Sequence, residues 1–142
     1  PPLRFEKDRV ALWSGIAEGT IDCIVSDHRP HDKEEKDIEF DEAQFGSINL
    51  QTVFSLLCSA KEFELNAVIS ALTVGARRVL EIDTRSIAED EIADLTLFSP
   101  DEEWTFTKEE ICSNTSNTPL LNRELTGKVV GIINNGKFDI KG

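Results

Sequence analysis

Residues 21–31 read IDCIVSDHRPH, a short apolar run that passes directly into an aspartate and two histidines. The run is β-branched at three positions and predicts a buried strand from Ile21 to Ser26. Side chains at the end of such a strand are typical of metal and catalytic sites in α/β proteins, because the strand fixes their direction while the next loop stays open. Asp, His and Pro are equally at home in solvated turns, so the pattern alone leaves both interpretations open.

The composition restricts the class of partner. The chain has 142 residues and a net charge of −12, which allows one ordinary domain and argues against nucleic acid or an anionic membrane as partner. No apolar run approaches the roughly 20 residues that span a bilayer, and no signal-peptide pattern is present. Cys23, Cys58 and Cys112 cannot all pair and predict reduced, mostly buried thiols of a cytoplasmic protein. The opening Pro1-Pro2, without methionine, suggests a fragment or a processed piece.

Hydrophobic periodicity predicts helices first and strands later. A helix is expected over residues 6–18, and three more over 49–58, 65–72 and 74–80, the first of these capped by Asn49. Beyond about residue 92 the period changes to two, which predicts strands at 93–97 and 104–107. Residues 129–133 and 137–140, joined by Asn134-Asn135-Gly136, are typical of a tight β-hairpin. One strand among helices cannot form a parallel sheet, so the neighbours of 21–26 must come from elsewhere.

Several motifs follow one another in a defined order. They are GTID (19–22), SDHRPH (26–31), EEK (34–36), AQFG (43–46), LQT (50–52), ADLTLF (93–98) and GKVV (127–130). Together they resemble the carboxyl-terminal third of a dihydroorotase, a family of the amidohydrolase superfamily. The resemblance implies an α/β fold, in which residues 1–82 end a (β/α)8 metal-dependent hydrolase barrel and residues 83–142 form the C-terminal part of a small β-sandwich.

The resemblance also implies an activity and site residues. Dihydroorotases interconvert N-carbamoyl-L-aspartate and L-dihydroorotate in pyrimidine biosynthesis at a zinc centre, usually of two ions. By resemblance, Asp27 is both a zinc ligand and the catalytic group that carries the proton to the ring nitrogen, a task that suits a carboxylate beside a metal-bound hydroxide. His31 and the backbone at Phe45 and Gly46 would contact the substrate, since a missing Cβ lets main chain approach a ligand. His28 is expected to be structural.

Departures from the family pattern keep alternatives open. Arg29 stands where alanine is common, and Asn49 and Gln51 replace a frequent Gly and Glu. These changes leave open a non-catalytic dihydroorotase-like subunit that supports aspartate transcarbamoylase, or a hydantoinase- or allantoinase-type cyclic amidase.

The remaining zinc ligands are expected upstream of Pro1: a His-x-His pair, a bridging Lys or Asp and two further histidines. A barrel needs about 250 residues, and Asp27 alone is too few ligands for zinc, so this chain by itself is expected to be inactive. The expected partners are the small-molecule substrate, the remainder of its own barrel, and either a second copy in a homodimer or aspartate transcarbamoylase.

Overall fold

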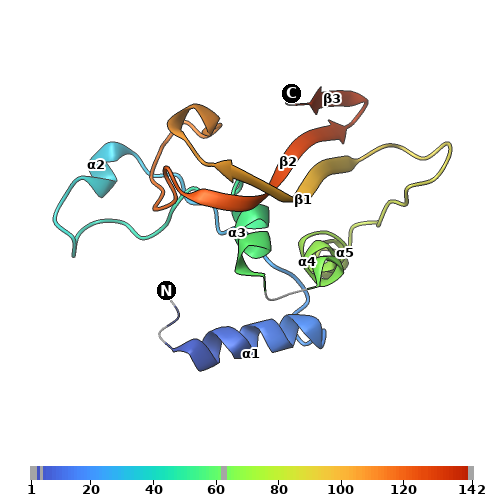
Figure 1. The fold of residues 1–142 in the computed structure, drawn as a ribbon, viewed down its shortest axis with the longest axis horizontal. Helices are drawn as coiled ribbons and strands as arrows, with labels where there is room; N and C mark the ends of the chain where they lie inside the picture. Colours follow the sequence, from blue (N-terminus) through green and yellow to red (C-terminus); the bar gives the residue numbers. More distant parts are fainter. Residues whose placement is uncertain (1–2, 4, 62–63, 141–142) are drawn as a thin grey trace. The chain divides into compact units, whose positions relative to one another are not determined.

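The chain forms two compact units. The computed structural model describes residues 3, 5–61 and 64–140. Unit 1 consists of Pro1–Val25, Ala60–Leu97 and Val130–Gly142, and unit 2 of Ser26–Ser59 and Phe98–Val129. The elements, in chain order (Figure 1), are α1 (Glu6–Ala17), α2 (Lys33–Lys36), α3 (Val53–Ala60), α4 (Leu65–Leu72), α5 (Val74–Val79), β1 (Leu95–Thr105), the 3-10 helix η1 (Lys108–Glu110), β2 (Glu124–Asn134) and β3 (Lys137–Ile140).

The strands form a three-stranded sheet in the order β1-β2-β3. Strands β2 and β3 are antiparallel, with Asn134 opposite Lys137. Between them Asn135 and Gly136 have φ angles of 48° and 74°, the left-handed conformation that a two-residue hairpin turn requires. The predicted hairpin is therefore confirmed. The two strands predicted near 93–97 and 104–107 are one strand, β1, which accommodates Pro100 because it lies at the end of the strand order, where a missing N–H is tolerated.

Unit 1 contains α1, α4 and α5, and the helices predicted over 6–18, 65–72 and 74–80 are confirmed. Val68 and Ala71 of α4 are buried. A Cβ added to Gly75 would lie 1.9 Å from the carbonyl oxygen of Asp22, so this glycine lets α5 approach the backbone that follows α1. The next helix prediction is also confirmed, but α3 begins at Val53, four residues beyond the predicted cap at Asn49.

The predicted strand from Ile21 to Ser26 is wrong. No strand is present over these residues, where the Ile24 N–H donates to the Ala71 carbonyl at 3.0 Å and the Val25 side chain is 74% exposed. A strand needs a ladder of hydrogen bonds to a neighbour. Within the described residues the nearest ladder contact is one isolated parallel bridge, between His28 and Ser47.

Unit 2 has a core that combines apolar and polar groups. Its buried apolar side chains are Ile48, Phe54, Phe106 and Leu125. Ser55 of α3 is 1% exposed, and its hydroxyl donates to the carbonyl of Gly127 in β2 at 2.5 Å. The indole Nε1 of Trp104 also donates to this carbonyl, at 3.0 Å. These contacts join α3 to the sheet within unit 2.

The three cysteines form no disulfide within the described residues, as predicted, but they are not mostly buried. Cys112 is exposed and Cys23 and Cys58 are half-buried. Cys112 lies in the loop that follows η1. Its burial was predicted wrongly because an apolar neighbour in the sequence does not place a loop residue in a core. Burial and the nearby Asp101 carboxylate raise the pKa of the Cys58 thiol.

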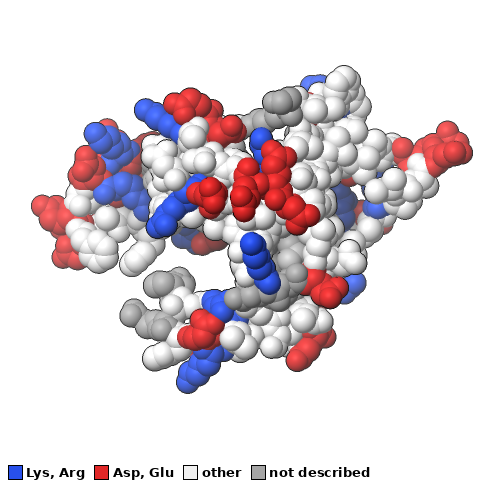
Figure 2. Space-filling model, viewed as in Figure 1, with Lys and Arg blue, Asp and Glu red and all other residues white. Residues whose placement is uncertain are grey.

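The surface carries mixed charge. On the face shown in Figure 2, Lys and Arg side chains lie between acidic ones rather than in one basic patch. Within the described residues, no helix is both long and apolar enough to cross a membrane.

Candidate functional site

Asp27 presents its carboxylate to solvent at the start of unit 2. Its φ angle is 43°, a left-handed conformation that Asp and Asn adopt more readily than most residues. The Nε of Arg29 donates to Asp27 Oδ1 at 2.9 Å, and the Asp27 and Arg29 side chains are 67% and 59% exposed. Such backbone outliers occur preferentially at functional sites. The carboxylate is thus held by its backbone and by one cation while remaining open to a ligand.

The His31 ring lies between α2 and the loop before Ser47. Its Nδ1 is 3.1 Å from Glu35 Oε2 and its Nε2 is 3.0 Å from the Phe45 carbonyl oxygen. Both partners are acceptors, so only the doubly protonated ring can donate to both. The His31 side chain and the Asp32 N–H both donate to the Glu35 carboxylate, and they hold the pKa of Glu35 below its usual value.

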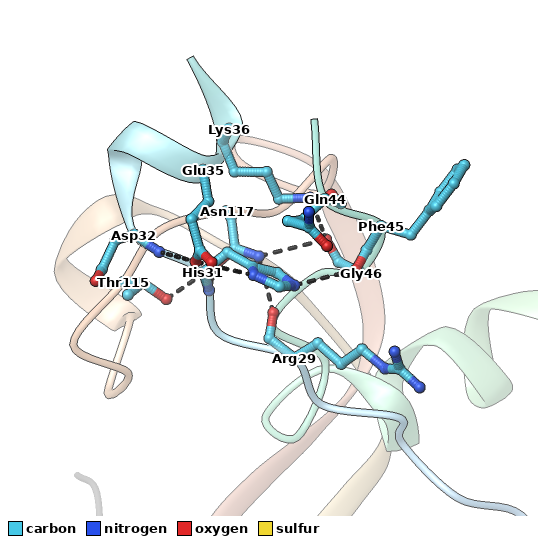
Figure 3. A network of polar contacts seen from close by, with 10 residues as sticks. All are labelled: Arg29, His31, Asp32, Glu35, Lys36, Gln44, Phe45, Gly46, Thr115 and Asn117. Carbon is cyan, nitrogen blue, oxygen red and sulfur yellow. Dashed lines mark hydrogen bonds and ion pairs between the residues drawn. The ribbon is translucent and has the colours of Figure 1, made fainter. Parts of the chain in front are cut away.

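The loop at Phe45 and Gly46 has its carbonyl oxygens turned toward protein donors. Lys36 Nζ donates to the carbonyls of Gln44 at 2.5 Å and of Gly46 at 2.7 Å, while the Phe45 carbonyl faces His31 (Figure 3). The N–H groups of Phe45 and Gly46 make no hydrogen bond with any residue that the structure describes. The phenyl ring of Phe45 is 84% exposed and points away from the network. The loop therefore offers two backbone donors to a ligand.

Gly46 is required by its conformation and by its neighbour. Its φ angle is +124°, and an added Cβ would lie 2.6 Å from the Cβ of Arg29. A side chain at this position would be both strained and overlapping. In this structure the space left by the missing side chain is filled by Arg29.

The sequence analysis gave no site role to Lys36, Glu35 or Asn117, although Glu35 and Lys36 lie within the EEK motif. The run 32–37 resembles an ordinary solvated charged segment, and Asn117 is 86 positions from His31, whose N–H it accepts. Nothing in the local spacing signals such a contact. His28, by contrast, has the structural role expected of it, because its Nδ1 accepts the N–H groups of Asn49 and Leu50.

A pocket of about 510 Å³ lies beside this network within unit 2. Its lining includes His31, Asn117 and the lysines at 33, 36 and 108. The volume is in the range of small-molecule sites. Asp27, Phe45 and Gly46 do not line it, so the pocket adjoins the predicted site residues without containing all of them.

The described residues do not by themselves fit a metal centre. No three His, Cys, Asp or Glu side chains among them are grouped so that they could hold an ion. Asp27 offers one carboxylate, whereas zinc sites in proteins have three or four protein ligands. The zinc that the resemblance implies would need ligands from residues other than these.

Comparison with solved structures supports the α/β fold class. D-hydantoinase from Bacillus sp. AR9 superimposes with a TM-score of 0.83 at 24% identity, covering 99% of this chain and 33% of that one. The dihydropyrimidinase from Brevibacillus agri NCHU1002 gives 0.80 at 23% identity, over 99% and 33% of the two chains. An inactive dihydroorotase-like domain of the CAD-like multifunctional protein of Chaetomium thermophilum gives 0.59 at 14% identity, over 96% and 36%. These likenesses concern the fold alone.

Sequence comparison identifies the family. No protein-family model matches the chain. Dihydroorotase from Clostridium acetobutylicum is 42% identical over 97% of this chain and 34% of its own length, and dihydroorotase from Aquifex aeolicus is 38% identical over 99% and 34%. Dihydroorotase from Geotalea daltonii is 36% identical over 96% and 33%. The chain spans about a third of the length of these curated relatives, and by this similarity it belongs to the dihydroorotase family.

Proposed function

We propose that the whole protein to which this chain belongs interconverts N-carbamoyl-L-aspartate and L-dihydroorotate. The observation that carries the proposal is the 42% identity to a dihydroorotase across 97% of the chain. The geometry is compatible with it, because Asp27, His31, Phe45 and Gly46 all belong to unit 2. The reaction belongs to pyrimidine biosynthesis. We propose that the protein carries it out in the cytoplasm.

Asp27 would act as the general base and acid. Its exposed carboxylate can accept a proton from the attacking water and return it to the ring nitrogen as the amide bond breaks. The N–H groups of Phe45 and Gly46, which make no hydrogen bond with the described residues, suit the carboxylate of the substrate, since charge-assisted bonds from backbone donors are strong. His31 would orient these donors through the Phe45 carbonyl, and it would contact the substrate by exchanging one of its present hydrogen-bond partners.

The zinc centre remains part of the proposal for the whole protein. Asp27 would supply one ligand and other parts of the protein the rest, so a variant lacking this carboxylate should bind less metal. Residues 1–82 would then close the barrel and residues 83–142 complete a β-sandwich. Unit 1 also exposes several apolar side chains, which further protein would cover in the whole enzyme. They include Val10, Leu12, Val25, Val79, Leu80 and Ile82.

The test compares the full-length protein with its Asp27→Asn variant. Asn tolerates the left-handed backbone and keeps the shape of Asp but cannot carry a proton. We expect dihydroorotate turnover to fall by about 10²–10⁴-fold, as for loss of a general acid–base, and the metal content of the two proteins separates loss of the proton carrier from loss of a zinc ligand. Equal turnover by the two proteins would refute the role of Asp27. Hydantoin and allantoin serve as competing substrates, and faster turnover of either would reassign the reaction.

A second candidate is a non-catalytic dihydroorotase-like subunit. The ion pair between Arg29 and Asp27 favours it, because the guanidinium already occupies one oxygen of the carboxylate. In that case the full-length protein would hold no zinc and turn over none of the three substrates. Co-purification with aspartate transcarbamoylase would then identify a mixed assembly, and purification as a homodimer would identify a self-assembly.

A further inference from the structure

The side chain of Asn117 joins three segments of unit 2. Its Oδ1 accepts the N–H of His31 at 3.1 Å and the hydroxyl of Thr115 at 2.9 Å. Its Nδ2 donates to the carbonyls of Arg29 at 2.9 Å and of Gly46 at 3.3 Å. Figure 3 shows the amide between the 29–31 segment and the Gly46 loop. One side chain therefore links the segment after Asp27 to the predicted substrate loop.

The partners of Asn117 require an amide. Two carbonyl oxygens on one side need donors, and a backbone N–H on the other needs an acceptor. Among side chains of this length, only Asn has both a donor nitrogen and an acceptor oxygen. This pattern also fixes which end of the amide is nitrogen. An aspartate here would keep the acceptor for His31 but place an oxygen against the two carbonyls.

The junction is held by backbone contacts as well. The carbonyl of Asn117 accepts the N–H of Ile48 at 3.0 Å, and Ile48 is 3% exposed. The N–H of Arg29 donates to the carbonyl of Ser47 at 2.9 Å. From the other side, Lys36 Nζ donates to the Gly46 carbonyl at 2.7 Å. The loop is thus fixed between Asn117 and Lys36, with its Phe45 and Gly46 N–H groups unpaired among the described residues.

We infer that Asn117 is a positioning residue of the substrate site, holding the backbone of His31 and the Phe45–Gly46 donors in binding geometry. The inference rests on the proposed function. Asn117 acts on groups that bind substrate and does not contact Asp27, so its loss should weaken binding more than the chemical step. Such a residue raises KM while leaving kcat nearly unchanged.

The experiment measures KM and kcat for dihydroorotate in full-length Asn117→Ala and Asn117→Asp proteins. Asn66→Ala is the matched control, because Asn66 is an exposed asparagine of α4 that does not line the pocket, and its side chain makes no hydrogen bond to the described residues. Asn117→Asp loses the two hydrogen bonds to carbonyls and Asn117→Ala loses all four side-chain hydrogen bonds. KM should therefore rise about tenfold or more in both variants, with kcat within about threefold. Asn66→Ala should match the wild type.

Hydrogen exchange provides a readout independent of turnover. The His31 N–H should exchange faster in Asn117→Ala and keep its protection in Asn117→Asp. The Ile48 N–H, bound to the main chain of Asn117, should stay protected in both variants and so report that the fold is retained. If Asn117→Ala does not fold, KM is measured in two other variants. Asn117→Asp removes the donor to the Gly46 carbonyl, and Lys36→Met removes the second donor to the same carbonyl. A rise in KM is expected in both.

The outcomes separate the two proposals. A merely structural role would lower the fraction of active protein, so kcat would fall with KM unchanged, and that result overturns the inference while dihydroorotase activity stands. Wild-type KM in every Asn117 and Lys36 variant overturns it equally. A wild-type protein that turns over no dihydroorotate refutes the proposed function and, with it, the substrate role of Asn117.

Discussion

The close approach of Gly127 to α3 makes a measurable prediction about unit 2. Its φ angle is +86°, and an added Cβ would lie 2.8 Å from both Cβ and Sγ of Cys58 and 3.2 Å from Cε1 of Phe54. The left-handed backbone costs a residue with a Cβ about 1–2 kcal/mol, and overpacking a tight contact costs about 1–3 kcal/mol. The Gly127→Ala variant should therefore lose about 2–5 kcal/mol of unfolding free energy.

Gly136 provides the matched control. Its φ angle is +74°, but an added Cβ meets nothing within 4 Å. Gly136→Ala should show the backbone cost without the overlap. Replacing glycine by alanine also reduces the conformational entropy of the unfolded chain, which stabilises each variant by about 0.4–1 kcal/mol. This contribution is the same in both variants and cancels when they are compared. The difference between the two variants therefore isolates the contact of Gly127 with α3, expected at about 1–3 kcal/mol.

Urea unfolding followed by tryptophan fluorescence measures the difference, because Trp104 donates to the Gly127 carbonyl. Exchange of the Thr126 N–H, which donates to Ser59 Oγ at 2.8 Å, reports opening at the same contact. Gly127→Ala should speed this exchange and Gly136→Ala should not. Equal stability of the two variants within about 0.5 kcal/mol, the range of ordinary surface substitutions, would refute the packing argument.

Three further predictions concern single contacts. Replacing Ser55 by Ala or Trp104 by Phe should each lower the free energy of unfolding by about 1 kcal/mol. The double variant should lose more than the sum of the two single losses, because only then does the Gly127 carbonyl lose both donors. Thermal unfolding of the three variants measures these losses. The pKa of Glu35 is lowered in the folded protein, so its contact with His31 contributes stability above the usual carboxyl pKa, and this stability is lost as pH falls through the folded-state pKa. In an NMR titration, His31→Asn should raise the Glu35 pKa. His28→Asn should leave it unchanged. At pH 8, peptide mapping should find Cys112 alkylated before Cys58, whose thiol is partly buried and has a raised pKa.

The sequence pattern predicted correctly those elements whose formation depends on neighbouring residues alone. The β2–β3 hairpin follows from Asn135-Gly136, since two left-handed residues suit the turn whatever lies around them. The helices follow from apolar periodicity, with α3 shifted to begin at Val53. The segment 21–26 was predicted wrongly because a strand is defined by its neighbour, and composition cannot say whether the neighbour is present.

The candidate site shows the same division. Asp27 and His31 stand out because they follow an apolar run, whereas Gly46 was assigned to the site only through the family resemblance. Asn117 could not be found in this way, since the backbone partners of its side chain lie 71 to 88 positions away along the chain. Its role depends on which backbone groups the fold brings together, a property that no short motif contains.

The hydrogen-bonding groups of unit 2 fall into two sets, and the division limits where a ligand can bind. His31, Lys36 and Asn117 already use their polar atoms on protein partners. A ligand that took a donor from His31 would have to displace either the Glu35 carboxylate or the Phe45 carbonyl. The Phe45 and Gly46 N–H groups need displace nothing among the described residues. Direct recognition is therefore expected from these two backbone donors, with His31 orienting them through the Phe45 carbonyl. On this argument the network around Asn117 contributes to binding mainly by keeping two amides aligned, which is why its loss should appear in KM.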